Sequence, residues 1–105
     1  MQTIIQVISA GTTSLRDTII NDKQLERFNL RASEHKRLTR PQGWAKLHMK
    51  GGYGAINIQW HAPSQTLICR IVTRGGQPYM IAGAFTSYLL ARLRRKIHSI
   101  QIIPG

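Results

Sequence analysis

Hydrophobic and polar residues alternate over residues 43–74 of this chain, which is typical of half-buried β-strands. The pair Gly51-Gly52 is a two-residue hairpin turn of the kind that needs positive φ, and residues 62–65 make a second turn. Counting outward from the first turn pairs Lys46 with Asn57, and counting from the second turn pairs Asn57 with Arg70. The pattern therefore predicts a three-stranded antiparallel meander over residues 43–74.

Both turns sort the side chains of the meander onto the same two faces, and this agreement predicts its register. One face is apolar and is expected to be buried; its members are Ala45, Leu47, Met49, Ile56, Ile58, Trp60, Leu67, Cys69 and Ile71. The other face is polar and cationic and is expected to be open. Apart from the apolar Ala55, Ile68 and Val72, its members are Trp44, Lys46, His48, Lys50, Asn57, Gln59, His61, Arg70 and Arg74.

Helices are predicted on both sides of the meander in the sequence. Ser14 opens a helical stretch with Asp17 as its capping-box partner, and Asn21-Asp22 looks like a second helix start. Apolar side chains then recur at helical spacing until Pro41, so that one bent helix or two short helices fit this region. After the meander, apolar residues recur every four positions and predict an amphipathic helix over residues 81–98.

Two further strands are predicted near the ends of the sequence. Residues 3–9 are rich in Ile and Val and indicate a buried strand, and residues 100–103 indicate a short closing strand. The predicted order is β-α-β-β-β-α-β. This order indicates an α+β fold in which the terminal strands extend the meander and the helices pack against one face.

Size and composition limit the kind of protein. With 105 residues, 42% of them hydrophobic, residues 1–105 are expected to form a single domain. No apolar run approaches the ~20 residues that span a bilayer, so we expect no integral membrane association. The single cysteine, Cys69, excludes an internal disulfide and suits the cytoplasm. We expect no cofactor, and the one cysteine and four histidines lack the spacing of a zinc site.

The distribution of charge changes the picture of the surface. The net charge is +11, and all four carboxylate side chains lie before residue 35, whereas residues 35–105 carry eleven Lys and Arg. Because unopposed like charge costs stability, this excess indicates a polyanionic partner whose phosphates supply the missing negative charge. A solubility role and binding to an anionic membrane surface are the competing interpretations.

The polar face of the meander is the strongest candidate site. Lys46, Asn57 and Arg70 form a row across the strands, and His48 and Lys50 lie further along the first strand. Because cross-strand neighbours are about 5 Å apart, one phosphate can meet several of these donors. A merely solvated face is the alternative, although such a face usually includes Glu or Thr partners for its lysines.

Aromatic and imidazole side chains extend the candidate chemistry. Trp44 is suited either to stacking on a base or to packing under a neighbouring helix. His48 and His61 point to the polar face and are candidate proton-transfer groups. Because metal-dependent phosphodiester chemistry needs clustered carboxylates, any nuclease activity is expected to be metal-free and to attack through the RNA 2′-hydroxyl.

A basic run ends the predicted long helix and has three interpretations. It can be solvated and matched to the helix dipole, it can extend the phosphate-binding surface, or it can lie on anionic lipid. Its cations are Arg92, Arg94, Arg95 and Lys96.

Two segments resemble the RelE/ParE-type toxins of bacterial toxin–antitoxin pairs. Residues 43–53 (GWAKLHMKGGY) are similar to the first central strand and hairpin of that family. Residues 70–79 (RIVTRGGQPY) are similar to its last core strand, which leads to a basic residue and then a tyrosine. By this resemblance Lys46, His48, Arg74 and Tyr79 would bind and cleave messenger RNA on the ribosome, and an acidic antitoxin would be the protein partner.

The chain also departs from that family. Its members commonly carry an arginine early in the second central strand, where this chain has Gly54-Ala55-Ile56, and the predicted helix 81–98 is longer than in the compact members. We therefore expect an RNA-binding protein that acts as a metal-independent endoribonuclease. The alternative is a non-catalytic nucleic-acid-binding module, such as a ribosome-associated or regulatory factor.

Overall fold

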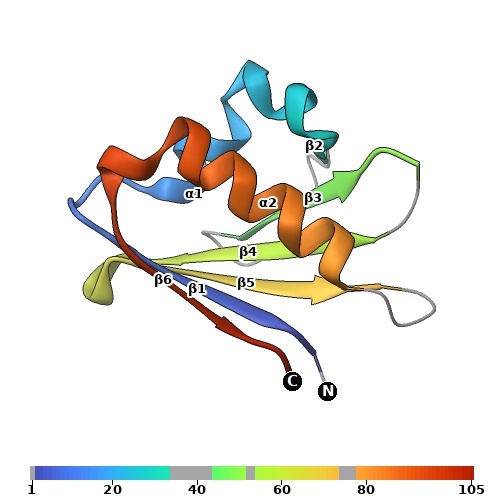
Figure 1. Ribbon diagram of the computed structural model, residues 1–105. Coiled ribbons are helices and arrows are strands. Elements are labelled where there is room, and N and C mark those ends of the chain that lie inside the picture. The colour runs from blue at the N-terminus through green and yellow to red at the C-terminus, as the bar shows by residue number, and fades with distance from the viewer. Residues whose placement is uncertain (1, 34–43, 52–53, 74–77) are drawn as a thin grey trace.

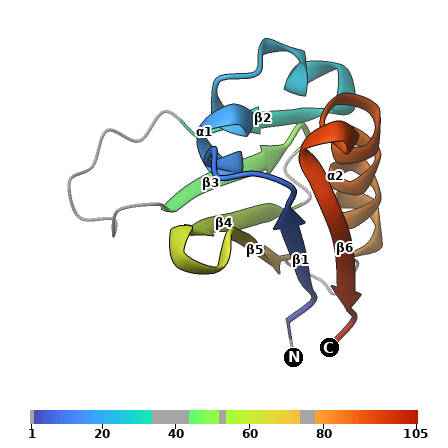
Figure 2. The same cartoon turned by 90° about the vertical axis from the view of Figure 1, so that its left-hand side faces the viewer.

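The fold is built on a single antiparallel sheet. The computed structural model describes residues 2–33, 44–51, 54–73 and 78–105 of the chain. Six strands lie in the order β2-β3-β4-β5-β1-β6. The helices α1 (Leu15–Ile20), η1 (Lys23–Phe28) and α2 (Tyr79–Arg92) lie over one face of this sheet (Figures 1 and 2). The α+β class is therefore confirmed. The strands are β1 (Ile4–Ser9), β2 (Leu30–Ala32), β3 (Trp44–Met49), β4 (Ala55–His61), β5 (Thr66–Val72) and β6 (Ile97–Ile103).

The register of the central strands agrees with the one that the turns predict. Lys46 pairs with Asn57, and Asn57 pairs with Arg70, so the predicted row across β3, β4 and β5 exists. The second turn is the 3₁₀ turn η2 (Ala62–Ser64), which ends at Gln65 in the left-handed region with φ 52°. Two turns of fixed length thus determine which side chains share a face.

The first helical region is shorter than predicted. Ser14 caps α1 (Leu15–Ile20) by accepting a hydrogen bond from the Asp17 backbone N–H, as the capping motif predicts. The second stretch is the 3₁₀ helix η1 (Lys23–Phe28), which Asp22 caps through the N–H of Gln24. Asn29 then adopts a left-handed φ of 61° and ends the helix, so that β2 follows where helix was predicted.

The long helix also ends earlier than predicted. The helix α2 (Tyr79–Arg92) is followed by the 3₁₀ turn η3 (Arg94–Lys96), and β6 begins at residue 97 instead of residue 100. Pairing explains the change, because β6 runs antiparallel along β1 and Ile97 faces Ser9. This pairing gives the backbone groups at the end of β1 hydrogen-bond partners. A longer helix would leave those groups unpaired.

The core lies between the sheet and the helices. Leu15 and Ile19 of α1 and Phe85 and Tyr88 of α2 have almost no exposed surface, and they pack on the apolar face of the sheet. From the sheet the core takes Ile5, Val7, Leu30, Leu47, Ile56, Ile58, Leu67, Cys69 and Ile71. The opposite face, which we call the outer face, carries no helix of the described residues.

Candidate nucleic-acid interface

Rows of paired residues build the outer face. One row runs Lys46, Asn57 and Arg70 across β3, β4 and β5, and continues through Ile4 of β1 to Ile103 of β6. A neighbouring row contains Trp44, Gln59, Ile68, Gln6 and Gln101. The cationic side chains thus belong to β3 and to Arg70 of β5, whereas Gln6 and Gln101 are uncharged polar residues of β1 and β6.

Aliphatic side chains cover the other half of the outer face. Val72 of β5 and Ile8 of β1 are each 43% exposed, and Ile103 of β6 is 39% exposed. Ile4 and Ile68 lie between them and are partly buried. The outer face is therefore divided into an apolar half on β5, β1 and β6 and a cationic half, which we define by Trp44, Lys46, His48, Asn57, Gln59 and Arg70.

Arg70 reaches across β4 to Trp44 and gives the cationic half its shape. Its guanidinium carbon lies 5.7 Å from the centroid of the Trp44 ring, which is a cation–π distance. The Nη1 atom of Arg70 is buried and has no hydrogen-bond acceptor among the described residues. Trp44 therefore packs against a cation of the outer face and not under a helix.

The start of β3 is fixed from the helical side. Arg16 of α1 donates from Nε and Nη2 to the backbone oxygen of Trp44, at 3.2 and 3.0 Å. The same guanidinium forms an ion pair with Asp17 at 2.6 Å. Because two hydrogen bonds hold the Trp44 carbonyl, the strand carrying Trp44, Lys46 and His48 begins at a rigid point.

The two histidines of the predicted site do not meet. His48 pairs with Ala55 at the first residue of β4, whereas His61 is the last residue of that strand. At about 3.3 Å per residue, six residues separate them by about 20 Å. The His61 ring contacts the Ser64 hydroxyl at 2.7 Å in the exposed η2 turn. The two histidines therefore share the predicted face but lie at opposite ends of β4, and His48 is the one that lies beside Lys46.

The remaining predicted residues near the sheet lie at its His48 end or outside the described residues. Tyr79 is the first residue of α2 and is 67% exposed. Lys50 follows β3 and is exposed, while its backbone N–H donates to the Asn29 oxygen at 2.8 Å. Arg74 falls outside the described residues.

One cation of the interface was missed by the sequence interpretation. Arg31 of β2 pairs with His48 and is exposed, so it extends the cationic half by one strand. The helical spacing of Leu25, Phe28 and Ala32 concealed this strand. Asn29, a residue that tolerates left-handed backbone, was the available sign that the helix ends there.

The basic run after α2 is divided between two roles. Arg92 donates to both carboxylate oxygens of Asp22, each at 3.2 Å, and the Tyr88 hydroxyl donates to the same carboxylate at 2.9 Å. Burial alone would raise the pKa of Asp22, but the hydrogen bonds from Arg92, the Gln24 N–H and Tyr88 hold this pKa below its ordinary value. Arg92 therefore holds α2 against η1.

The other cations of the run lie in η3 and not on a helix end. Arg94, Arg95 and Lys96 are exposed there, on the helical side of the sheet. They lie apart from the cationic half, so any phosphate contact that they make would be separate from that surface.

Comparison of the chain with protein-family models, with curated protein sequences and with solved structures finds no match. Within residues 2–33, 44–51, 54–73 and 78–105, no three His, Cys, Asp or Glu side chains gather as metal ligands. Among the same residues, no helix has the length and apolar character that crossing a bilayer requires.

Proposed function

We propose that this protein binds RNA across the cationic half of its outer face. The observation that carries the proposal is the row Lys46–Asn57–Arg70, which three adjacent strands hold on the outer face of the sheet, each side chain partly exposed. Lysine and arginine donate to phosphate oxygens, and Asn57 adds an amide between them. Such a row suits the backbone of a nucleic acid that lies across the strands.

The environment of Arg70 supports this proposal. Its guanidinium already lies against an aromatic ring, but Nη1 has no acceptor among the described residues. Because a buried donor without a partner is unfavourable, a phosphate or base oxygen arriving at this face would be bound by a small movement of Arg70. Trp44 would then offer its ring to a base, as aromatic side chains do in single-stranded RNA sites.

The experiment is a salt titration of RNA affinity with two matched variants. We expect wild-type affinity for a short single-stranded RNA to fall steeply with salt, because bound phosphates release counterions. Lys46→Ala should weaken binding and lower the log–log salt slope by about 1. Lys23→Ala removes the same charge from the exposed η1 helix on the other side of the sheet and should change little. A flat salt dependence, or equal effects of the two variants, would contradict the proposal.

Cleavage of the bound RNA, as in the RelE-like toxins, is the second candidate function. One observation favours it: His48 lies two residues from Lys46 on the same face of β3, and Tyr79 is exposed at the same end of the sheet. An imidazole beside a phosphate-binding lysine suits general acid–base catalysis of 2′-hydroxyl attack. The ribosome and an acidic antitoxin belong to this candidate as partners.

Rates and affinities separate the two candidates. His48→Gln and Tyr79→Phe should preserve RNA affinity within tenfold and lower the cleavage rate by about 10²–10⁴. His61→Gln is the control, because that histidine lies at the other end of β4 and should leave both quantities unchanged. The assay runs with and without ribosomes and in the presence of EDTA. Absence of cleavage by the wild-type protein under all these conditions would leave RNA binding alone.

A further inference from the structure

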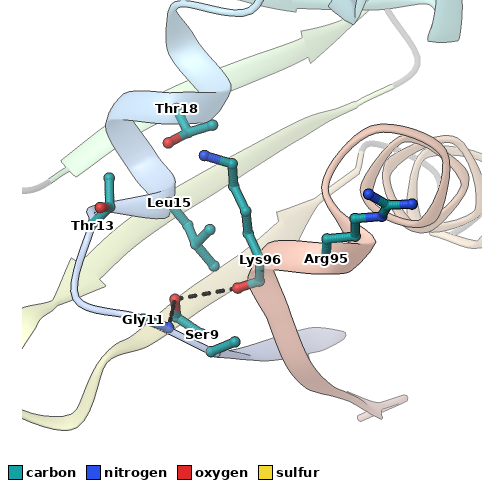
Figure 3. A pocket seen from close by; sticks show the side chains of 8 residues that line it. Ser9, Gly11, Thr13, Leu15, Thr18, Arg95 and Lys96 are labelled. Atoms are coloured by element: carbon teal, nitrogen blue, oxygen red, sulfur yellow. Dashed lines mark hydrogen bonds between the residues drawn. The ribbon is translucent and has the colours of Figure 1, made fainter.

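A small cavity lies away from the outer face, where the end of β1 approaches η3. Its volume is about 220 Å³, and Figure 3 shows its walls: the loop after β1, the first turns of α1 and the turn η3. Ser9, Thr13 and Thr18 bring hydroxyl groups to it, and Lys96 brings an ammonium group. These hydroxyl and ammonium groups are donors suited to an anion, and Ala10 and Leu15 add apolar wall beside them.

Backbone hydrogen bonds give the cavity a rigid floor. The Lys96 carbonyl accepts from the Ala10 N–H at 2.9 Å and from the Ser9 hydroxyl at 3.4 Å. The Ser9 hydroxyl oxygen also accepts from the Gly11 N–H at 3.1 Å. These contacts join the β1–α1 loop to η3, so the Lys96 side chain starts from a fixed position.

Two donors of the cavity, the Lys96 ammonium group and the Thr13 hydroxyl, have no partner among the described residues, whereas the Thr18 hydroxyl donates to the Ser14 oxygen at 3.1 Å and the Ser9 hydroxyl donates to the Lys96 oxygen. In Figure 3 the Lys96 side chain extends across the opening toward Thr18, whereas the Arg95 guanidinium points away from Ser9 and Gly11. Lys96 forms no ion pair with any carboxylate of the described residues, where Asp17 and Asp22 pair with Arg16 and Arg92. The Thr13 hydroxyl makes no hydrogen bond within that part of the chain, and the 3.4 Å bond of Ser9 is long enough to be exchanged.

We propose that this cavity binds a phosphate monoester. Such a group carries a charge of about −2 and three acceptor oxygens, and it can take an ammonium donor and two or three hydroxyl donors at once. At about 30 Å³ for each displaced water, the cavity holds a phosphate and part of an attached sugar. The ligand is a free nucleotide or the terminal phosphate of an RNA chain, and only the second source depends on the proposed function.

The first measurement is an NMR titration of the amide resonances with inorganic phosphate. We expect saturable shifts at Gly11, Thr13 and Thr18 for the wild-type protein. Lys96→Gln should abolish these shifts, and Lys96→Arg should restore part of them. Arg94→Gln removes the same charge from the same turn without touching the cavity, and should behave as wild type. Shifts that do not saturate, or that persist equally in Lys96→Gln, would overturn the proposal.

The second measurement identifies the source of the phosphate. A 5′-phosphorylated RNA oligonucleotide, the same oligonucleotide with a 5′-hydroxyl, one with a 3′-phosphate and a nucleoside monophosphate are compared as ligands. If one phosphorylated end raises RNA affinity tenfold or more, and Lys96→Gln removes the difference, the RNA terminus is the ligand. Tight binding of the monophosphate alone identifies the free nucleotide. The variant Lys46→Ala should weaken RNA binding without changing the phosphate titration, so failure of one proposal is distinguishable from failure of the other.

Discussion

The guanidinium of Arg70 lies 5.7 Å from the centre of the Trp44 ring, although these residues belong to strands that β4 separates. The contact joins the two outer strands of the meander over Asn57 and Gln59, which lie between them in the sheet. It also positions an indole beside the row Lys46–Asn57–Arg70. The pair therefore provides a fluorescence test of the proposed RNA binding.

The two tryptophans of the chain lie on opposite faces of the sheet and provide this test. In Trp60→Phe the remaining indole is Trp44, and we expect RNA to quench its emission because a base stacks near it. In Trp44→Phe the remaining indole is Trp60, which packs against the core and should be unaffected. Trp44→Ala should weaken RNA binding by about 1–3 kcal/mol, the usual value of one stacked base. Quenching confined to Trp60 would contradict the proposal, because it would indicate that RNA binds on the helical side of the sheet and not on the outer face.

Neighbouring residues of β4 provide a test of the register. Ile58 is fully buried and Asn57 lies on the outer face between Lys46 and Arg70. Ile58→Asp buries an unpaired carboxylate and should remove most of the stability of a small domain, which is about 5–15 kcal/mol. Asn57→Asp should leave the protein folded. Chemical denaturation followed by circular dichroism measures both, and equal midpoints would show that the faces are assigned wrongly.

The Asp22 carboxylate gives the stability a pH dependence of known sign. Because the pKa of Asp22 is lower in the folded protein than in the unfolded chain, its contribution is present above the unfolded pKa. That contribution is lost as the pH falls through the folded pKa. Asp22→Asn should cost about 1–3 kcal/mol at pH 7, where the charge-assisted hydrogen bonds from Arg92 and Tyr88 are weakened. The difference between variant and wild type should shrink in acid, and urea denaturation at neutral and acidic pH measures it.

Two glycines should respond oppositely to replacement by alanine. Gly54 has φ of 147°, and a Cβ there would lie 2.9 Å from Thr73 Cγ2 and 3.2 Å from the Val72 oxygen. Gly54→Ala should therefore destabilise the protein by about 1–3 kcal/mol. Gly83 lies within α2 with no atom within 4 Å of an added Cβ. Gly83→Ala should stabilise the protein by about 0.5–1 kcal/mol, because alanine favours the helix. Thermal unfolding of the two variants would show melting temperatures on opposite sides of the wild-type value.

The sequence predicts those parts of the fold in which turn length and strand alternation determine the pairing of nearby residues. The row Lys46–Asn57–Arg70 follows from two turns and the alternation of strand side chains, and it agrees with the structure. The end of η1 depends on one residue, Asn29, and helical spacing around it predicts helix where β2 forms. Local patterns therefore specify pairing well where a turn fixes it and poorly where a single backbone conformation ends an element.

Contacts between residues far apart in the sequence cannot be predicted from local patterns of turns and side-chain alternation. Arg92 and Asp22 are 70 positions apart, and nothing in either segment indicates that they meet. The same holds for the cavity between Ser9 and Lys96, which depends on β6 pairing with β1. The apolar half of the outer face also depends on strand order, since β1 and β6 add Ile8 and Ile103 beside the meander. These features follow from the order of strands in the sheet.

The position of β1 between β5 and β6 has a consequence for how the chain reaches its fold. One neighbour, β5, consists of residues 66–72, and the other, β6, consists of residues 97–103. Every pairing of β1 therefore joins segments far apart in the sequence. Such a topology has high contact order, which slows folding because long loops must close before these pairings form. During synthesis, the meander can form before β6 has been made, so that β1 then lacks one of its two neighbouring strands. We therefore expect the apolar side chains of β1 to be the part of the chain most exposed to aggregation before folding is complete.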